Sequence, residues 1–328
     1  MCLSALGAIL AAQLATGLWL DGPGLLARFA DARRVLAAAD ARTTPVDLLI
    51  VGSSRLAFSV DASALEARLR EHFGADAPEV FQAAIPAGDA IAHDWLGPRL
   101  AERGIRPRLA VVEIAPESFA LYNRWLNFHV TRQFTWLDLA YFLPDIARRG
   151  SFGRVLATRL APVFYYRYEL LLAAFGRPPP YLVAPQPERA SPERSEEDVR
   201  RHRLEATQDD LRSIRRWLRG YTLRGHTAEA YERVLERLTD AGTAIVLVQP
   251  PVTRAYAALY SDDVETRYAE HVLELITRYD AEYVDLRDRL PDDDFYDSHH
   301  TTELGREAFT PVFADEAVIP ALERLGYE

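Results

Sequence analysis

The sequence predicts an α/β protein of three layers (α/β/α), with a flavodoxin-like parallel sheet of about five strands between two layers of helices. Short apolar runs rich in Val, Ile and Leu alternate with stretches of helical periodicity. The alternation stops near residue 117 and resumes near residue 226, which predicts a helical insertion after the third strand. The 328 residues are enough for one such domain with a large core.

The expected strands are short, and those at 46–51 and 108–114 are dense in apolar residues on both faces, as in a parallel sheet that helices cover on both sides. The strands are expected at 46–51, 79–84, 108–114, 243–249 and 281–286. Helices with an apolar stripe are expected around them, at 25–39, 61–73, 89–103, 227–240, 264–279 and 302–324. Asp61 is a candidate N-cap for the second of these helices.

Residues 117–225 form the predicted insertion, which we interpret as part of the same domain. Its many aromatic residues indicate a small core or, alternatively, a platform for substrate. The stretch 176–195 contains six prolines and is expected to be a loop. The helix expected at 197–219 mixes Arg with Glu and Asp, as a solvent-exposed face does, although it can also contact an anionic lipid or polymer.

Residues 1–20 contain no charged side chain and are long enough to cross a bilayer as a helix. We therefore expect a membrane anchor at 1–20, a juxtamembrane helix and linker at 21–45, and the α/β domain at 46–328. A buried N-terminal helix is the alternative, whereas the lack of a basic start and of an A-x-A site disfavours a cleaved signal peptide. Arginines and aspartates both follow the segment, so its orientation stays open, and we expect an extracytoplasmic domain in the cell envelope.

The composition excludes several classes of function. All 38 residues counted as Lys or Arg are arginine, which excludes a Schiff-base lysine, a pyridoxal site and a phosphate-loop lysine. The net charge of -10 and the pI of about 5.4 argue against nucleic acid as a partner. Cys2 is the only cysteine, which excludes an intrachain disulfide and a structural zinc site built from cysteines. No cofactor is expected.

Three polar residues follow the first and the last expected strands, so they can meet in one site although they lie far apart in the sequence. Ser54 follows the first expected strand, while Asp297 and His300 follow the last one. The carboxyl ends of parallel strands lie at one edge of the sheet, where such folds bind ligands. A serine nucleophile needs a base to take its proton, and the base needs a partner that fixes its tautomer. We therefore predict Ser54 as nucleophile, His300 as base and Asp297 as the orienting carboxylate.

Each of these residues also has a structural interpretation. Ser54 can cap the helix that follows it, because serine is a favoured N-cap. Asp297 can pair with His300 only to begin the last helix. The acidic loop can hold a metal, although such a turn is more commonly solvated, and we predict no metal site. The metal alternative would use Asp292, Asp293, Asp294, Asp297, His299 and His300.

The segment around Ser54 resembles the first block of the SGNH (GDSL-like) hydrolases. In that family an apolar strand is followed by Gly-Asp-Ser, with the serine as nucleophile. Here Gly52, Ser53 and Ser54 follow the first strand, with serine in place of the aspartate. This short turn differs from the G-x-S-x-G elbow of α/β-hydrolases.

The segment around His300 resembles the family's last block, Asp-x-x-His followed by a glycine five residues later. Asp297, His300 and Gly305 match that block, and Phe309 stands at its usual apolar position. The resemblance covers the frame on either side of the insertion, 46–116 and 226–328. It implies the same three catalytic residues.

The resemblance also implies an oxyanion hole made of backbone N–H groups at Ser54 and at Ala87 or Gly88. The family's third block contributes an asparagine, which the matching stretch EIAPESF lacks. Arg55 and Asn123 are candidates to replace it as substrate contacts. These departures are similar to the envelope-associated branch of the family, whose members move acyl groups on or off cell-surface polysaccharides.

The sequence thus predicts a serine-dependent ester hydrolase or O-acyltransferase. Its expected substrate is an acyl ester or an acylated glycan, as in a cell-envelope polysaccharide or glycolipid, and residues 1–20 are expected to contact the membrane. A catalytically inactive SGNH-like binding or scaffold protein of envelope assembly is the alternative, favoured by the missing asparagine. Metal-dependent hydrolysis is a third possibility.

Overall fold

The chain forms two compact units in a computed structural model, which describes residues 2–21, 30–86, 88–119, 135–148, 152–167, 170–171, 196–219 and 221–328. Unit 1 consists of Met1–Arg34 and Arg124–Arg189, and unit 2 consists of Val35–Asn123 and Ala190–Glu328. The predicted insertion is divided between them, because its middle part belongs to unit 1 and its last helix to unit 2.

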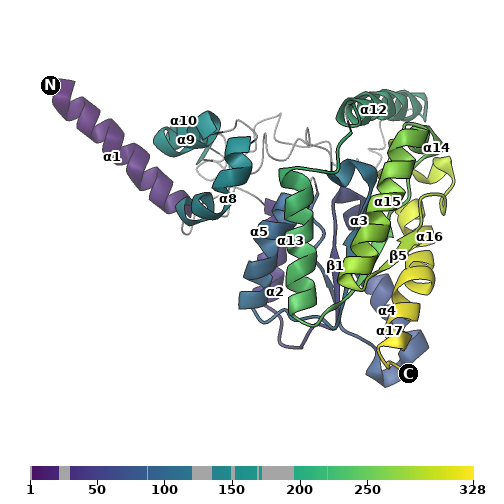
Figure 1. The fold of residues 1–328 in the computed structure, drawn as a ribbon. Coiled ribbons are helices and arrows are strands. Elements are labelled where there is room, and N and C mark those ends of the chain that lie inside the picture. The colour runs from purple at the N-terminus through teal and green to yellow at the C-terminus, as the bar shows by residue number, and fades with distance from the viewer. Residues whose placement is uncertain are drawn as a thin grey trace. The chain divides into compact units, whose positions relative to one another are not determined.

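Unit 2 is built on a sheet of five parallel strands (Figure 1). The strands are β1 (Leu48–Val51), β2 (Val80–Gln82), β3 (Leu109–Glu113), β4 (Ala244–Gln249) and β5 (Glu282–Asp285). The predicted fold class, a parallel five-stranded sheet flanked by helices, is confirmed. The strands are shorter than the apolar runs that predict them, because those runs continue into buried loop residues such as Val46 and Ala83.

The order of the strands in the sheet is β2-β1-β3-β4-β5, so the direction of winding reverses between β1 and β3. Leu48 pairs with Leu109 and Val51 pairs with Val112, and the two strands therefore end side by side. Every residue of both strands is buried. Open α/β sheets bind their ligands at the carboxyl edge beside such a reversal. The residues that follow β1 and β3 are therefore in position to form a site.

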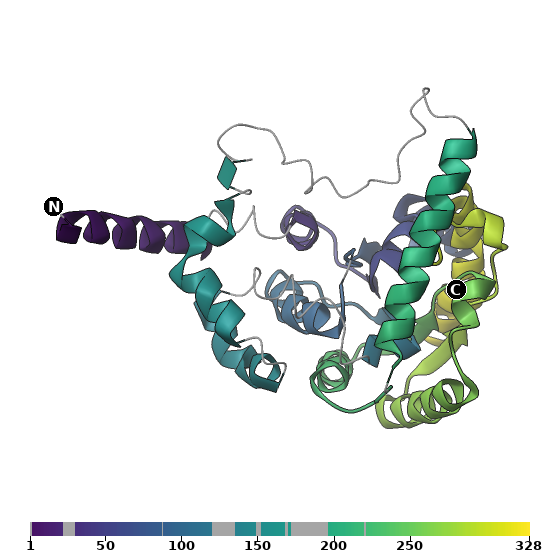
Figure 2. The same cartoon turned by 90° about the horizontal axis from the view of Figure 1, so that it is seen from above.

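Alternate side chains of the strands face two helical layers. One face, which includes Leu48, Ile50 and Val111, shares a core cluster with the first layer. This layer consists of α3 (Ser54–Ser59), α4 (Ala62–Phe73), α16 (Glu303–Phe313) and α17 (Ile319–Arg324). The layer on the opposite side of the sheet (Figure 2) consists of α5 (Ala90–Glu102), α13 (His226–Asp240) and α15 (Asp262–Tyr279).

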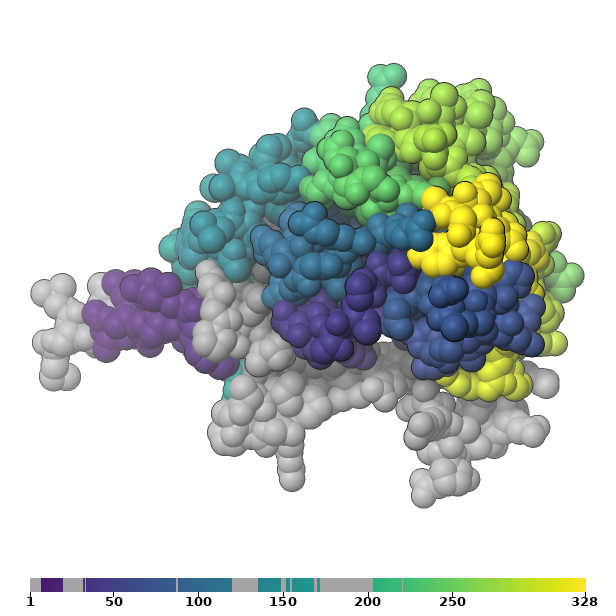
Figure 3. All heavy atoms as spheres, turned by 90° about the horizontal axis from the view of Figure 1, so that it is seen from below, coloured from purple at the N-terminus to yellow at the C-terminus, as the bar shows by residue number. Residues whose placement is uncertain are grey.

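The start of α4 has the predicted cap. Asp61 Oδ1 accepts hydrogen bonds from the N–H groups of Ser63 (2.9 Å) and Ala64 (3.0 Å), which confirms Asp61 as the N-cap. Helix α4 lies beside the C-terminal residues (Figure 3), where His72 Nε2 is 3.0 Å from Glu323 Oε1.

The last predicted helix, 302–324, is divided into two. Thr302 caps α16 by accepting a hydrogen bond from the N–H of Gly305 (3.1 Å), and a π-helical turn, Ala314–Val318, joins α16 to α17. The helix predicted at 25–39 is α2 (Ala30–Asp40), and residues 22–29 lie outside the described ones.

Two further helices of unit 2 lie near the carboxyl edge of the sheet. Helix α12 (Glu196–Trp217) is the charged helix predicted at 197–219, whereas the short α14 (Arg254–Ala257) is not predicted. Side chains from α12 and from the segment around α14 form one apolar cluster: Ile214, Leu218, Tyr221, Val252, Tyr256, Tyr260 and Val264. Helix α12 therefore has a buried side in addition to its charged side.

Unit 1 contains helices from the N-terminal segment and from the insertion. They are α1 (Cys2–Asp21), α8 (Trp136–Arg148), α9 (Phe152–Leu160) and α10 (Pro162–Tyr165). Helix α1 packs against α9 and α10. In the part of the chain that the structure describes, no helix has both the length and the apolar character of a membrane span.

Candidate active site

Ser54 is the first residue of α3, directly after the turn that ends β1. The turn needs Gly52, because a Cβ atom there would lie 2.7 Å from Glu113 Oε2 and 2.9 Å from Leu56 Cδ1. Ser53, rather than Ser54, is the N-cap of α3, since the Ser53 hydroxyl accepts a hydrogen bond from the N–H of Arg55 (3.2 Å). The structural interpretation of Ser54 as the cap is therefore wrong, and its hydroxyl is left for other contacts.

Asp297 and His300 lie in the loop between β5 and α16. Asp297 Oδ1 accepts hydrogen bonds from the N–H groups of His299 (2.9 Å) and His300 (2.8 Å), which fixes the turn that connects the two residues. Gly305 lets α16 approach this loop, because a Cβ atom at that position would lie 2.3 Å from the carbonyl oxygen of Asp294. The glycine of the predicted last block thus has a packing reason in this chain.

The structure brings Ser54, His300 and Asp297 together in one chain of hydrogen bonds. His300 Nε2 is 2.7 Å from Ser54 Oγ, and His300 Nδ1 is 2.6 Å from Asp297 Oδ2. The edge of the Phe58 ring packs on the imidazole, with centroids 5.4 Å apart. One ring nitrogen therefore faces a hydroxyl while the other faces a carboxylate, as in a serine hydrolase site.

The electrostatics of Asp297 favour its ionised form. Burial raises the pKa of a carboxyl, but here the hydrogen bond and the charge of His300 outweigh burial and hold the pKa of Asp297 below its ordinary value. An ionised Asp297 accepts a hydrogen bond from the N–H at Nδ1 of His300, so Nε2 carries no proton and is free to accept the proton of Ser54.

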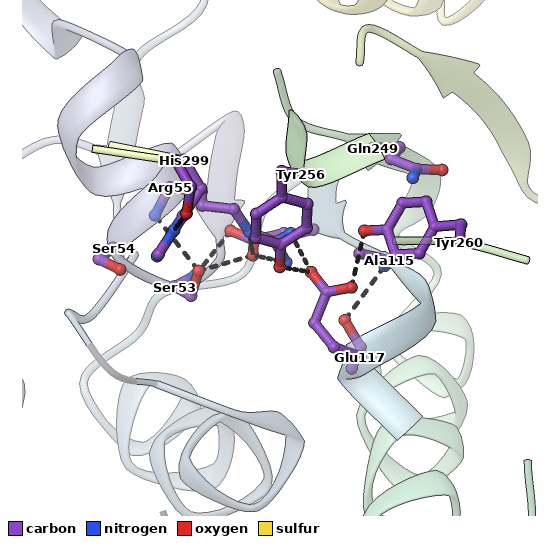
Figure 4. A network of polar contacts seen from close by, with 12 residues as sticks. Ser53, Ser54, Arg55, Ala115, Glu117, Gln249, Tyr256, Tyr260 and His299 are labelled. Carbon is purple, nitrogen blue, oxygen red and sulfur yellow. Dashed lines mark hydrogen bonds and ion pairs between the residues drawn. The ribbon is translucent and has the colours of Figure 1, made fainter. Parts of the chain in front are cut away.

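A buried ion cluster lies behind Ser54 (Figure 4). The Arg55 guanidinium binds Glu113 at the end of β3, with Nε 2.9 Å from Oε1, and also binds Glu117. All three side chains are at most 7% exposed. Arg55 is thus held by ion pairs inside the protein, which differs from the predicted substrate contact. Burial disfavours its charged form, but Glu117 and Glu113 outweigh burial and raise the pKa of Arg55 well above its ordinary value.

Two tyrosines complete this cluster. The hydroxyls of Tyr256 and Tyr260 each donate a hydrogen bond of 2.8 Å to the carboxylate of Glu117. Burial and the charge of Glu117 raise the pKa of both phenols well above the ordinary value, so both remain neutral donors. The loops after β1, β3 and β4 are therefore joined by one polar network at the carboxyl edge.

A second carboxylate reaches the site from α12. Asp210 Oδ2 is 3.5 Å from Ser298 Oγ and 3.7 Å from His299 Nδ1. Burial and the neighbouring Asp297 raise the pKa of Asp210 to about 7. The ring of His299 packs on Tyr256, with centroids 5.5 Å apart, and burial followed by the charge of His300 lowers the pKa of His299 well below its ordinary value.

The metal alternative can be compared with this arrangement. Within the described residues, Asp210, Asp297, His299 and His300 each offer one ligand atom within 4.8 Å of the others. The group does not include Asp292, Asp293 and Asp294 of the acidic loop. Both ring nitrogens of His300 already face Ser54 and Asp297, so metal binding there would compete with the hydrogen-bonded chain.

The predicted oxyanion donors differ in whether their N–H group already has a hydrogen-bond acceptor. The N–H of Ser54 lies in the first turn of α3, where a helix has no acceptor of its own. The N–H of Gly88 donates a hydrogen bond of 2.7 Å to the carbonyl oxygen of Ile85 and is thus engaged in a turn. Ala87 and Asn123 lie outside the described residues.

Several site residues were missed by the sequence prediction. Glu113 carries a signal, because an acid is unusual at the end of an otherwise apolar buried strand. Tyr256 and Tyr260 are four positions apart, a spacing that also occurs in ordinary cores. Asp210 lies in a helix full of charges and carries no local signal, since its role depends on where α12 packs.

No protein-family model matches the chain, and no curated protein matches it. Solved structures are similar in fold at low identity. One from Streptococcus pneumonia, whose name connects it with platelet activating factor, is 11% identical with a TM-score of 0.42, covering 96% of this chain and 97% of its own.

Two other solved structures match a smaller part of the chain. A lipase/acylhydrolase from Enterococcus faecalis is 11% identical with a TM-score of 0.37, covering 83% of this chain and 97% of its own. An alpha/beta hydrolase enzyme from the metagenome of Lake Arreo, Spain, is 12% identical with a TM-score of 0.37. The match covers 82% of this chain and 94% of that one. These likenesses are too distant to assign an activity, which rests on the geometry of the residues.

Proposed function

We propose that the protein is a serine-dependent ester hydrolase or O-acyltransferase. One observation carries the proposal: the hydroxyl of Ser54, the imidazole of His300 and the carboxylate of Asp297 are joined at hydrogen-bonding distances of 2.7 and 2.6 Å. They come from opposite ends of the chain, and they lie at the carboxyl edge of the sheet. A hydroxyl at one ring nitrogen and a buried carboxylate at the other are typical of a catalytic base and are not required of a histidine that only stabilises the fold.

The first half of the reaction forms an acyl-enzyme. Ser54 Oγ attacks the carbonyl carbon of the ester while His300 Nε2 accepts the hydroxyl proton. Asp297 stabilises the imidazolium that forms. The tetrahedral intermediate then expels the alcohol, which takes the proton from Nε2 as it leaves. We expect the N–H of Ser54, in the first turn of α3, to donate a hydrogen bond to the developing oxyanion.

The second half decides between hydrolysis and transfer. His300 Nε2 removes a proton from the second acceptor, whose oxygen attacks the acyl carbon. The bond to Ser54 Oγ then breaks, and Oγ takes that proton back from Nε2. Water as acceptor gives a carboxylic acid, whereas a sugar hydroxyl gives a new ester. We propose an acylated polysaccharide or glycolipid of the cell envelope as the substrate, because the departures from the SGNH middle blocks resemble the envelope-associated branch.

Residues 1–20 support a location at a membrane within this proposal. They contain no charged side chain, and they would keep the catalytic unit close to an extracytoplasmic envelope substrate. This location can be tested separately from the chemistry.

The experiment uses a fluorophosphonate probe and short acyl esters with the full chain. Wild-type protein should be labelled covalently and should release the acyl group. Ser54→Ala should abolish labelling and lower the hydrolysis rate by several orders of magnitude. Ser63→Ala, at an exposed serine of α4, is the matched control and should behave as the wild type. Undiminished labelling of the Ser54→Ala protein would remove Ser54 from the mechanism.

A catalytically inactive binding or scaffold protein is the second candidate. The observation that favours it is the engaged N–H of Gly88, which leaves the oxyanion with fewer donors than the family supplies. Loss of one such donor typically costs about 10²–10³ in rate. Folded wild-type protein that neither reacts with the probe nor turns over any acyl ester would support this candidate.

A further inference from the structure

The exposed apolar side chains of this protein are concentrated in unit 1. Among the described residues, only three exposed large hydrophobic residues belong to unit 2: Leu204, Leu273 and Leu304. Those of unit 1 are Ile9, Leu10, Leu14, Leu18, Trp19, Trp136, Leu137, Tyr141, Leu143, Phe152, Leu156, Leu160, Phe164 and Leu171. A concentration of exposed large apolar side chains in one unit is typical of an interaction surface.

The described side chains of α1, at 7–19, are apolar except for Gln13 and Thr16, and most of them are uncovered. Ile9 and Leu10 are 57% and 59% exposed, and Leu14 and Leu18 are 65% and 62% exposed. Because Ile9 and Leu10 point about 100° apart around the helix, more than one side of α1 is uncovered. A helix that is hydrophobic on all sides is ordinarily buried in a core or in a membrane.

The side of α1 that is covered contacts the insertion. Gln13 Oε1 accepts a hydrogen bond of 3.0 Å from the N–H of Val163, in the first turn of α10. Gly17 of the same helix face is 3.8 Å from Cγ of Pro162. The contact satisfies the amide oxygen of Gln13 and also an N–H that has no acceptor within its own helix. Polar groups that enter hydrocarbon must find such internal partners.

We propose that α8, α9 and α10 of the insertion form, together with α1, one apolar surface that inserts into a lipid bilayer. The proposal goes beyond an anchor made of residues 1–20, because the insertion itself enters the lipid, and it does not rest on the proposed chemistry. Since α1 packs on α9 and α10, whatever covers α1 must also accommodate those helices.

The polar residues of this surface fit a bilayer better than a second protein. Trp19 and Trp136 are both exposed, and tryptophan is enriched where a bilayer meets water. The stretch 152–165, which contains α9 and α10, has no acidic residue, and its Arg159 is buried at 8% exposed. The exposed large side chains of this stretch are all apolar, as contact with hydrocarbon requires: Phe152, Leu156, Leu160 and Phe164.

The test measures flotation of the full chain with vesicles of phosphatidylcholine and phosphatidylglycerol. Leu160→Glu and Phe164→Glu change residues of the insertion that are 64% and 60% exposed, and they leave α1 intact. Each should lower the partition coefficient by about tenfold or more, because a charge would replace an apolar side chain that enters the bilayer. Leu273→Glu, on α15 and 61% exposed, is the matched control and should not change it.

The outcomes separate the bilayer from other occupants. Equal flotation of the two insertion variants and the wild type would overturn the proposal, because an N-terminal anchor alone would then explain binding. Wild-type protein that forms a defined oligomer without detergent and does not float would also overturn it, in favour of a second copy. Thermal unfolding of each variant checks that a lost signal does not reflect a lost fold.

Discussion

The Ser53 hydroxyl donates a hydrogen bond of 2.6 Å to Glu113 Oε1, and the Ser53 N–H donates one of 2.8 Å to Glu113 Oε2. The residue before the nucleophile is thereby tied to the end of β3. An aspartate at position 53, as in the SGNH first block, would place two carboxylates in contact and would be disfavoured by their repulsion. Serine at this position is therefore consistent with a glutamate at the end of β3.

The first prediction concerns Arg55. Arg55→Met removes the positive charge from between Glu113 and Glu117, which leaves two buried carboxylates without a counter-charge. Breaking a buried pair in this way typically costs about 3–5 kcal/mol in the free energy of unfolding. The loss can be measured by urea unfolding.

The control for this substitution is Arg68→Met. Arg68 also pairs with two carboxylates, those of Asp315 and Glu71, but at the surface. The free energy of unfolding of the Arg68→Met protein should stay close to that of the wild type, because exposed ion pairs contribute little to stability. Equal stability of the two variants would show that the buried cluster is not needed for the fold.

The second prediction concerns Asp297→Asn. The amide oxygen has to accept the N–H groups of His299 and His300, so the amide nitrogen then faces Nδ1 of His300. The imidazole must place its proton on Nε2, where it can no longer accept the proton of Ser54. The proposed ester hydrolysis should slow by about 10⁴, the typical cost when the histidine of a serine hydrolase is held in the wrong tautomer. Asp293→Asn, at an exposed position of the same loop, should retain activity, and full activity of Asp297→Asn would contradict this role.

The sheet could be predicted from the sequence because its central strands β1, β3 and β4 are almost entirely buried. Within 108–114, residues 109–112 are apolar throughout, and a parallel sheet covered by helices accommodates such a strand. Asp297 and His300 were placed together because a three-residue spacing in one turn is a local property. Their meeting with Ser54 followed from the topology, since parallel strands end at a common edge.

The rest of the site depends on contacts between distant loops. Glu117 follows β3, whereas Tyr256 and Tyr260 follow β4, and no local pattern shows that they share one cluster. The cap lies at Ser53, one residue before the position of the alternative interpretation, because both serines satisfy the same preference. Asp210 joins the site only because α12 packs on the segment around α14.

The third prediction concerns Gly305→Ala. Alanine is favoured over glycine in a helix by about 1 kcal/mol, but its Cβ would lie 2.3 Å from the carbonyl oxygen of Asp294. Only a backbone shift can relieve this clash, and overpacking of this kind typically lowers the free energy of unfolding by about 1–3 kcal/mol. The variant should be less stable in urea and should lose activity, because the shift moves the turn of Asp297. Gly97→Ala, in α5, meets only Arg237 Nη1 at 3.7 Å apart from its chain neighbours. Because Pro98 follows and disfavours a Cβ at a helical residue before it, this control should stay close to the wild type in stability. An equal loss of stability in both variants would contradict the steric argument.

The last prediction uses the pKa of Asp210, which burial and Asp297 raise from 3.8 to about 7 in the folded protein. The folded state keeps a proton that the unfolded chain releases, so the free energy of unfolding should fall as the pH rises from about 4 to about 7. The lowered pKa of Asp297 acts only below about pH 4 and lies outside this window. His299 and His300, which also face Asp210, are present in every variant.

Asp210→Asn should remove on the order of 1–2 kcal/mol of this pH-dependent fall in the free energy of unfolding, allowing for partial exposure of the carboxyl. Urea unfolding at about pH 5 and about pH 8 measures it, with Asp209→Asn, 75% exposed, as the control. An unchanged pH dependence in Asp210→Asn would show that this carboxyl is already ionised in the folded protein.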